Sequence, residues 1–301
     1  MMPPRLTPLL RPLLLLLLLL LSFHRASGRV RGKGRRYLVF SSVGAHCGDA
    51  VHNYWLRDGI ETAVFDLVLV YYGEPETVLE QGLRRLSERY PEHFTLIRRK
   101  GLKWANFRWW ALEGGGVRSL DELQNRYDAI WIPDDDMRMD TTSINTFFRT
   151  VQRFPSVQIA SPSFTKESEG VWRYHDVHQT GILLRYTNFV ENSATLLRPA
   201  VLRDSMFQKC LKAVISGCYL DFCFFAAVGY QEDAIAIVDA AVCWHPHRKS
   251  ELVEKLGVEW QDHWKDKDSF ERQKVPKEVY WWREPVHFGH EGVYKGSQDK
   301  A

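Results

Sequence analysis

Three consecutive aspartates, Asp134, Asp135 and Asp136, follow an apolar segment that ends in Pro133. Carboxylates on one short turn repel each other, so the turn is destabilised unless a cation or hydrogen bonds compensate for the charge. Carboxylate oxygens suit Mg²⁺ or Mn²⁺, and such an ion can also bind substrate phosphates and neutralise a departing diphosphate. The alternative is an aspartate-rich turn that caps the helix after it.

The elements that must position this turn follow from hydrophobic patterning. Continuous apolar runs rich in β-branched and aromatic residues are typical of strands buried on both faces. Such runs predict strands over residues 37–43, 65–72, 127–132 and 235–243, with weaker candidates at 157–160 and 181–189. Helical spacing of apolar residues predicts helices over residues 77–90 and 141–154, with Asp140 or Thr141 as N-cap of the second. The short, almost wholly apolar segment 220–228 predicts a buried helix.

This alternation of strands and helices predicts an α/β fold. We expect a single domain with a mainly parallel twisted sheet, flanked by helices on both faces. We place it at residues 37–290, followed by a polar tail at 291–301. Ligands of such sheets bind beyond the carboxyl ends of the strands. The acidic turn follows one of these ends, so the functional site is expected there.

The N-terminal segment predicts entry into the secretory pathway. Its leucine run at residues 13–21 belongs to an apolar stretch shorter than the roughly 20 residues of a membrane span. We interpret residues 1–28 as a signal peptide or, alternatively, as a short signal anchor that holds the chain in the Golgi membrane. Six Lys and Arg at residues 25–36, against two before the run, favour cleavage. Residues 29–36 form a basic stem, and both interpretations place the domain in the lumen or outside the cell.

The five cysteines suit that compartment. A local disulfide is predicted from Cys210 to either Cys218 or Cys223, and the odd count leaves at least one cysteine unpaired or in an intermolecular bond. No Cys-x-x-Cys pair occurs, which disfavours a zinc ribbon or a thioredoxin-type site. The net charge of +3 indicates no particular partner, and we expect no nucleic acid binding.

Residues 127–140 (YDAIWIPDDDMRMD) resemble the DxD region of GT-A glycosyltransferases. More closely, the chain resembles a domain family, common in plants, that carries the label "lysine ketoglutarate reductase trans-splicing related". The likeness spans residues 37 to about 245 and includes YLVFSSVG at 37–44, FDLVLVYYG at 65–73 and KGLKWANFRWWAL at 100–112. It implies a GT-A-like, metal-dependent glycosyltransferase that uses a nucleotide sugar, UDP-linked above all, and a glycan or other hydroxyl acceptor.

The label itself suggests an oxidoreductase, but the motifs do not support one. Gly-x-Gly-x-x-Gly is absent after the first strand, and no Gly-x-x-x-x-Gly-Lys-Ser/Thr motif supports a P-loop kinase or ATPase. Two alternatives to the transferase stay open. One is a non-catalytic lumenal sugar-binding or scaffold protein of the same fold, and the other is a metal-dependent phosphohydrolase that uses the same acids.

The resemblance also implies a role for individual residues. Asp134 and Asp136 would bind Mn²⁺ or Mg²⁺ together with His245, for which His247 is a competitor, while Asp135 would lie near the ribose or donor sugar. The donor nucleotide would be held at the end of the first predicted strand by Ser41, Ser42 and Gly44. Its diphosphate or base would be approached by residues between the second and third predicted strands: Lys100, Lys103 and Asn106. The alternative for the three residues at 100–106 is a solvated basic loop.

Asp221 precedes a short apolar helix. In an inverting transferase, a carboxylate at this point can take the proton from the acceptor hydroxyl. Its alternative role is helix N-cap. Residues 178–191, with Trp109, Trp110 and Trp172, are candidates for the acceptor side of the site, and core aromatics beside a structural ion pair are the alternative.

Overall fold

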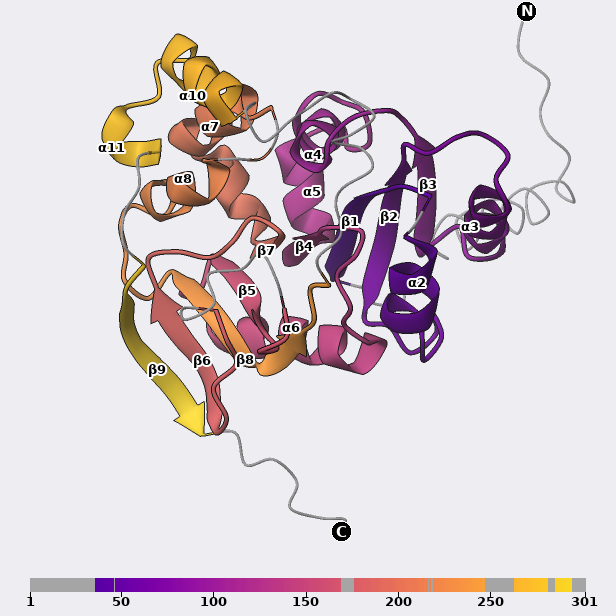
Figure 1. Cartoon of the computed structure of the whole chain (residues 1–301), viewed down its shortest axis with the longest axis horizontal. Coiled ribbons are helices and arrows are strands. Elements are labelled where there is room, and N and C mark those ends of the chain that lie inside the picture. Colours follow the sequence, from indigo (N-terminus) through magenta and orange to yellow (C-terminus); the bar gives the residue numbers. More distant parts are fainter. Residues whose placement is uncertain are drawn as a thin grey trace, which may run out of the picture. The chain divides into compact units, whose positions relative to one another are not determined.

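A computed structural model describes residues 36–45, 47–168, 176–215, 217, 219–246, 263–280 and 285–293. One sheet runs through these ranges, with nine described strands in the order β3-β2-β1-β4-β7-β5-β8-β6-β9. The strands are β1 (Tyr37–Val43), β2 (Phe65–Tyr71), β3 (Phe94–Arg98), β4 (Ala129–Pro133), β5 (Ile159–Phe164), β6 (Ile182–Thr187), β7 (Ala194–Leu197), β8 (Ile235–Cys243) and β9 (His287–Val293). In Figure 1 they cross the view from β3 on the right to β9 on the left.

Most of these strands run in one direction. β1 is parallel to β2 and β4, β2 is parallel to β3, and β5 is parallel to β8. β7 is antiparallel to both β4 and β5, and β6 is antiparallel to both β8 and β9. Seven of the nine described strands therefore share a direction, and β6 and β7 oppose it. This confirms the predicted α/β fold with a mainly parallel sheet.

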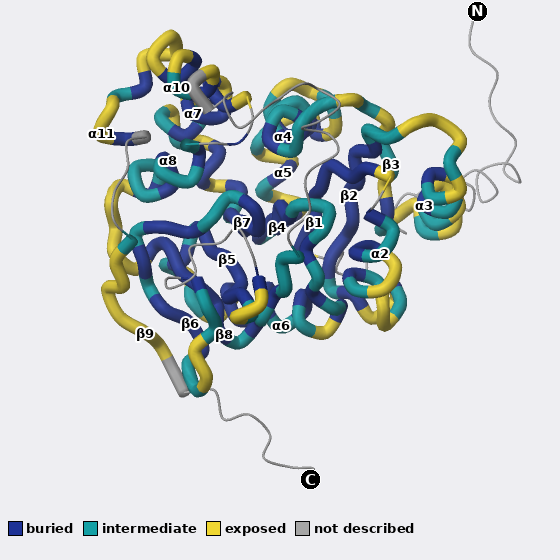
Figure 2. Tube along the Cα trace, in the orientation of Figure 1, coloured by how far each residue is buried: buried dark blue, intermediate teal, exposed yellow. Residues whose placement is uncertain are grey.

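Helices cover both faces of the sheet. The helical segments in the described ranges are α2 (Gly48–Ala50), η1 (Val51–Trp55), α3 (Val78–Arg89), α4 (Lys103–Leu112), α5 (Leu120–Arg126), α6 (Thr141–Arg153), η2 (Pro199–Arg203), α7 (Ser205–Ala213), α8 (Leu220–Ala227), α10 (His263–Arg272) and α11 (Lys277–Tyr280). Because successive strand residues point to opposite faces, β1 contributes Val39 to one apolar core and Phe40 to the other. The first core packs against η1, α3 and α6, and the second against α4, α5, α7 and α8. Figure 2 shows the central strands buried between these layers.

Capping residues fix where two of the predicted helices begin. The Thr77 hydroxyl accepts a hydrogen bond from the Glu80 backbone N–H at the start of α3. The Asp140 carboxylate accepts one from the Ser143 backbone N–H at the start of α6. Each bond satisfies a donor that the first helical turn leaves unpaired. Both helices match the predicted ranges to within one residue at each end.

Three described strands have no strong pattern in the sequence. β3 and β9 lie at the two edges of the sheet, where a half-exposed strand shows no continuous apolar run. β7 is only four residues long. β9 continues to Val293, three residues beyond the domain boundary expected at residue 290.

Several expectations concern residues outside the described ranges. These are the signal peptide or anchor at residues 1–28, most of the basic stem, Trp172, Cys218, His247 and the tail from residue 294 onward. The N-terminal interpretations therefore stay predictions. In the part of the chain that the structure describes, no helix combines the length and the apolar character needed to span a bilayer.

A disulfide joins Cys210 of α7 to Cys223 of α8. The sequence leaves Cys218 and Cys223 open as partners of Cys210, and the structure selects Cys223. Cys47 and Cys243 are buried free thiols, and burial raises the pKa of both. The crosslink fixes the first turn of α8 to α7, two residues after Asp221.

Replacing both Cys210 and Cys223 with alanine is expected to destabilise the fold by about 3 kcal/mol. The crosslink lowers the conformational entropy of the unfolded chain, and for a loop of this length that loss stabilises the folded state by about this free energy. Urea denaturation without reductant measures the difference. Reductant is expected to lower the stability of the wild type and to leave the double variant unchanged. Equal stability of wild type and variant without reductant would contradict the crosslink.

Candidate functional site

The acidic turn lies where the carboxyl ends of β1 and β4 meet. β1 and β4 are parallel neighbours, so residues that follow them project from the same edge of the sheet. The fully buried Ser41 hydroxyl donates to the Pro133 carbonyl at 2.8 Å. This bond fastens the end of β1 to the residue directly before Asp134. The Ser41 side chain is thus engaged in holding the two strand ends together.

Asp135 is tied to the ends of β1 and β2. Its Oδ2 accepts hydrogen bonds from the Gly44 backbone N–H at 2.8 Å and from the Tyr72 hydroxyl at 2.9 Å. A Cβ at position 44 would come within 2.5 Å of that hydroxyl, which explains why glycine stands there. Burial raises the pKa of Asp135 to about 6, and the charges of Asp136 and Asp134 add to the rise, while the two hydrogen bonds oppose it.

A bridge between the backbones of Arg138 and Trp244 brings Asp136 and His245 together. Arg138 and Trp244 exchange two backbone hydrogen bonds of 2.9 and 3.0 Å, which join the acidic turn to the end of β8. As a result, His245 Nε2 lies 3.4 Å from Asp136 Oδ1. Burial lowers the pKa of His245, but the Asp136 hydrogen bond and the charges of Asp136 and Asp134 outweigh it, so the net shift is upward.

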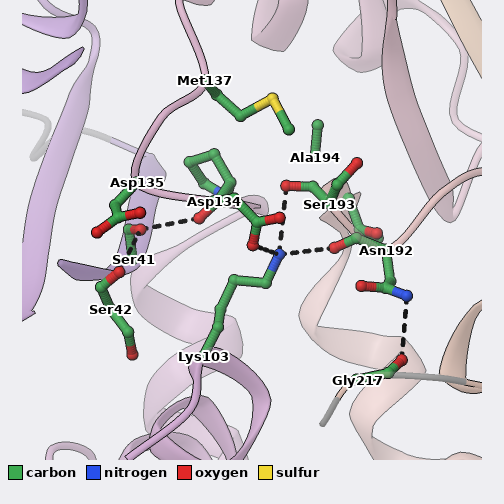
Figure 3. A network of polar contacts seen from close by, with 12 residues as sticks. Ser41, Ser42, Lys103, Asp134, Asp135, Met137, Asn192, Ser193, Ala194 and Gly217 are labelled. Carbon is green, nitrogen blue, oxygen red and sulfur yellow. Dashed lines mark hydrogen bonds and ion pairs between the residues drawn. The ribbon is translucent and has the colours of Figure 1, made fainter. Parts of the chain in front are cut away.

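Asp134 pairs with a lysine instead. Lys103, the first residue of α4, places its Nζ 2.6 Å from Asp134 Oδ1. The same ammonium donates to the Asn192 carbonyl at 2.7 Å and to the Ser193 carbonyl at 3.2 Å. Figure 3 shows it between the acidic turn and this loop, with the Asp135 carboxylate directed away from it. Lys103 is therefore at the site, as predicted, but its ammonium contacts protein oxygens.

These contacts indicate which side chains could coordinate a metal ion. Among the described residues, no three His, Cys, Asp or Glu side chains gather closely enough to hold an ion by themselves. Asp136 and His245 form a pair, and the buried Nδ1 of His245 has no hydrogen-bond partner among the residues that the structure describes. A divalent ion that binds one or two protein groups completes its shell with water and substrate phosphates. The pair fits an ion of that kind, and Asp134 stands apart on Lys103.

The remaining predicted donor-binding residues divide into buried and exposed ones. Asn106 is fully buried, and its Nδ2 donates at 2.8 Å to both the Ser42 hydroxyl and the Gly101 carbonyl. Its Oδ1 accepts a hydrogen bond from the Arg99 guanidinium. Asn106 therefore holds the end of β1 against the start of α4. Lys100 is exposed on the loop between β3 and α4, and its role in donor binding stays a prediction.

Asp221 lies in the first turn of α8, whose N-cap is Tyr219. The alternative role of Asp221 as N-cap is therefore wrong. Its Oδ2 accepts a hydrogen bond from Asn192 Nδ2 at 3.3 Å, and its Oδ1 accepts one from the Phe222 backbone N–H at 3.1 Å. Burial raises the pKa of Asp221 to about 7, although these hydrogen bonds act against the rise. A carboxyl with such a pKa can accept a proton near neutral pH.

The segment expected on the acceptor side contains a structural ion pair. Arg185 Nε donates to Asp239 Oδ2 at 2.7 Å, and the two side chains are 3% and 0% exposed. Trp110 is buried in the core, and Trp109 lies against the Arg99 guanidinium. In the same segment, the charge of Glu191 contributes to the raised pKa of His245.

No family model and no curated protein sequence matches the chain. Among solved structures, it is similar to the mannosyltransferase PcManGT from Pyrobaculum calidifontis, in complex with GDP-Man and Mn²⁺, with 13% identity and a TM-score of 0.42 over 78% of this chain and 66% of that one. It is also similar to S. aureus TarS 1-349 in complex with UDP-GlcNAc, with 10% identity and a TM-score of 0.45 over 79% of this chain and 66% of that one.

A third similar structure is GalNAc-T7 with UDP, GalNAc and Mn²⁺, with 9% identity and a TM-score of 0.46 over 75% of this chain. The chain spans 66% of the length of the first two proteins and 49% of the third. All three are glycosyltransferases of low sequence identity, and the likeness concerns the course of the chain alone.

Three residues of the site were not predicted from the sequence. Tyr72 follows β2 directly, and the rule that strand ends share an edge could have found it. Asn192 lies in the turn before β7, a strand too short to predict. Arg138 pairs with Trp244 across more than a hundred residues, a contact that only the folded chain defines.

Proposed function

We propose that this protein is a glycosyltransferase that moves a sugar from a nucleotide-sugar donor to a hydroxyl acceptor with the help of a divalent metal ion. One observation carries the proposal. A proton-accepting carboxyl, Asp221, is linked through Asn192 and Lys103 to Asp134. Asp134 belongs to the same acidic turn as Asp136, which forms a carboxylate–imidazole pair with His245. Inverting, metal-dependent sugar transfer uses both functions: a cation for the diphosphate and a base for the acceptor.

The metal ion would be held by Asp136 and His245 and by the donor diphosphate. When bound, a Mn²⁺ or Mg²⁺ ion neutralises the negative charge that develops on the departing diphosphate. Asp135, Gly44 and the Tyr72 hydroxyl lie on the β1 side of the turn, where the nucleoside would bind. Placement of the nucleoside there is supported by the general position of ligands beyond parallel strand ends.

Asp221 would act on the acceptor. Its carboxylate takes the proton from the acceptor hydroxyl while the hydroxyl oxygen attacks the anomeric carbon. The bond from that carbon to the diphosphate breaks, and the diphosphate leaves with the bonding electrons. A lumenal location is part of the proposal, and the Cys210–Cys223 disulfide supports it, because disulfides persist in oxidising compartments.

Replacing Asp136 with asparagine, or His245 with alanine, is expected to weaken metal-dependent nucleotide binding at least about tenfold, which is ~1.4 kcal/mol. The thermal shift of the purified protein with UDP, with and without Mn²⁺, measures this. The wild type is expected to be stabilised only when both are present. Asp233→Asn, an exposed carboxylate between α8 and β8, is the control. Shifts that persist in both site variants would remove the pair from the metal site.

Product analysis separates the proposed reaction from its two alternatives. Incubation with nucleotide sugars is expected to release a nucleoside diphosphate together with a glycosylated acceptor. Release of inorganic phosphate would indicate a phosphohydrolase instead. Sugar or nucleotide binding without any turnover would indicate a sugar-binding or scaffold protein.

A further inference from the structure

The Lys103 ammonium has no proton left for a substrate. A lysine ammonium carries three N–H donors, and Lys103 faces three protein oxygens: Asp134 Oδ1, the Asn192 carbonyl and the Ser193 carbonyl. Its side chain is only 9% exposed. To bind a diphosphate, the ammonium would have to leave at least one of these partners. The sequence predicted that Lys103 binds the donor. Its contacts instead join the acidic turn to residues 192–193, and we call this set of contacts the tether.

The tether holds the loop that faces Asp221. Asn192 supplies a main-chain oxygen to Lys103, while its side-chain amide points the opposite way. Asn192 Nδ2 donates to the Gly217 carbonyl at 3.0 Å and to Asp221 Oδ2 at 3.3 Å. Asn192 therefore connects the lysine to the Asp221 carboxyl, and Figure 3 shows it between Lys103 and Gly217. The two donors of the amide group match the two acceptors.

The backbone just before Asp221 has positive φ angles at two residues. Gly217 has φ +112°, and Tyr219, the N-cap of α8, has φ +66°. Left-handed backbone at a residue other than glycine persists only where its surroundings hold it. Two contacts flank this backbone: the Asn192 bond to the Gly217 carbonyl before it and the Cys210–Cys223 disulfide after it.

We propose that Lys103 and Asn192 are positioning residues for the acceptor half of the site. The lysine fixes the main chain of residues 192–193 to the acidic turn, and the Asn192 amide then sets the orientation of the Asp221 carboxyl. This inference rests on the proposed function, because it assigns the tether to the base of that reaction. It also assigns Asp134 to the lysine and leaves metal binding to Asp136 and His245.

Lys103→Met removes the charge and the three donors but keeps most of the aliphatic stem. The variant is expected to lower kcat about 10- to 100-fold, within the loss typical of a misplaced reacting group. The affinity for UDP with Mn²⁺ is expected to stay within about twofold of the wild type, since no donor contact is removed. Titration calorimetry and initial rates measure the two quantities. Lys209→Met, at an exposed lysine of α7, is the matched control.

Asn192→Asp tests the second half of the tether without a change in side-chain shape. It replaces the donor facing Asp221 with a carboxylate, and a neighbouring like charge favours the protonated form. The rising limb of kcat against pH is therefore expected to move to higher pH by about one unit or more. Asp176, whose buried carboxyl also interacts electrostatically with Asp221, is unchanged in this variant. Asn192→Ser, which keeps a small donor, is expected to shift the limb less.

Three outcomes overturn the inference. A large loss of UDP affinity in Lys103→Met with an unchanged kcat would make the lysine a donor ligand. Unchanged kcat and affinity in that variant would make the tether irrelevant to the reaction. A pH profile that stays fixed in a folded Asn192→Asp would separate Asn192 from Asp221. Metal-dependent UDP binding that is absent from the wild type itself would instead contradict the proposed function.

Discussion

Asp221→Asn is expected to lower kcat for sugar transfer by about 10²- to 10⁴-fold, the loss typical of removing a general base. The asparagine keeps the size of the side chain but cannot take the acceptor's proton. Donor binding is expected to persist, because Asp221 contacts Asn192 and the Phe222 backbone and none of the residues assigned to the metal. Initial rates and UDP titrations on the same preparation measure both effects. A variant with wild-type turnover would exclude Asp221 as the base.

The pKa of Asp221, raised by burial to about 7, sets the pH dependence of the same experiment. Below that pH the carboxyl keeps its proton, so kcat is expected to rise about tenfold per pH unit and to level off above neutrality. The asparagine variant is expected to lose this limb. A limb that survives in Asp221→Asn would belong to another group.

The stability of the folded protein is expected to fall as pH rises, whereas kcat rises. An unfolded aspartate has a pKa of about 3.9, so between pH ~4 and ~7 the folded state binds more protons than the unfolded state. Stability therefore falls as pH rises through this window, and the loss is complete above the folded pKa. Asp221→Asn removes that loss, so at pH ~8 the variant is expected to be at least as stable as the wild type. Asp268→Asn, at an exposed position of α10, controls for the change in net charge.

Trp131→Ala is expected to destabilise the fold by about 3–5 kcal/mol, the cost of deleting a large buried aromatic side chain. Trp131 is fully buried on β4, with its ring 5.9 Å from that of Trp55 and 6.2 Å from that of Phe147. Its Nε1 also donates to the Ala194 carbonyl at 2.9 Å, which links β4 to β7. The free energy of unfolding in urea measures the loss.

Trp131→Phe separates the two contributions of this side chain. Phenylalanine keeps most of the ring packing and leaves the Ala194 carbonyl without its indole donor. Its cost is therefore expected to be about 1–3 kcal/mol, the range for one unsatisfied buried group. Equal costs for the two variants would mean that the hydrogen bond, and not the packing, dominates at this position.

Strands buried on both faces could be predicted from the sequence because their apolar runs are continuous. The predicted ranges 37–43 and 235–243 coincide with β1 and β8. β7 could not be predicted, because its four residues, ATLL, fit a turn, a helix or a strand equally well. Its antiparallel direction depends on where the chain returns, which no local pattern contains.

The candidate site shows a similar division. The acidic turn was predictable because it directly follows an apolar strand. The pairing of Asp136 with His245 depends on the Arg138–Trp244 bridge, and the pairing of Asp134 with Lys103 depends on how α4 packs on the sheet. Charge and spacing along the sequence identify which residues can do chemistry, but they do not decide which carboxylate meets the lysine and which meets the histidine.

The position of β7 constrains the order in which the chain can fold as it is synthesised. β7 lies between β4 and β5 and pairs with both, yet it follows both in the sequence. Until Leu197 has left the ribosome, the open edge of β4 and its apolar residues have no partner strand. An exposed edge of this kind promotes association with other chains. The nascent protein is therefore expected to be prone to association with other chains in the interval between the emergence of β4 and that of β7.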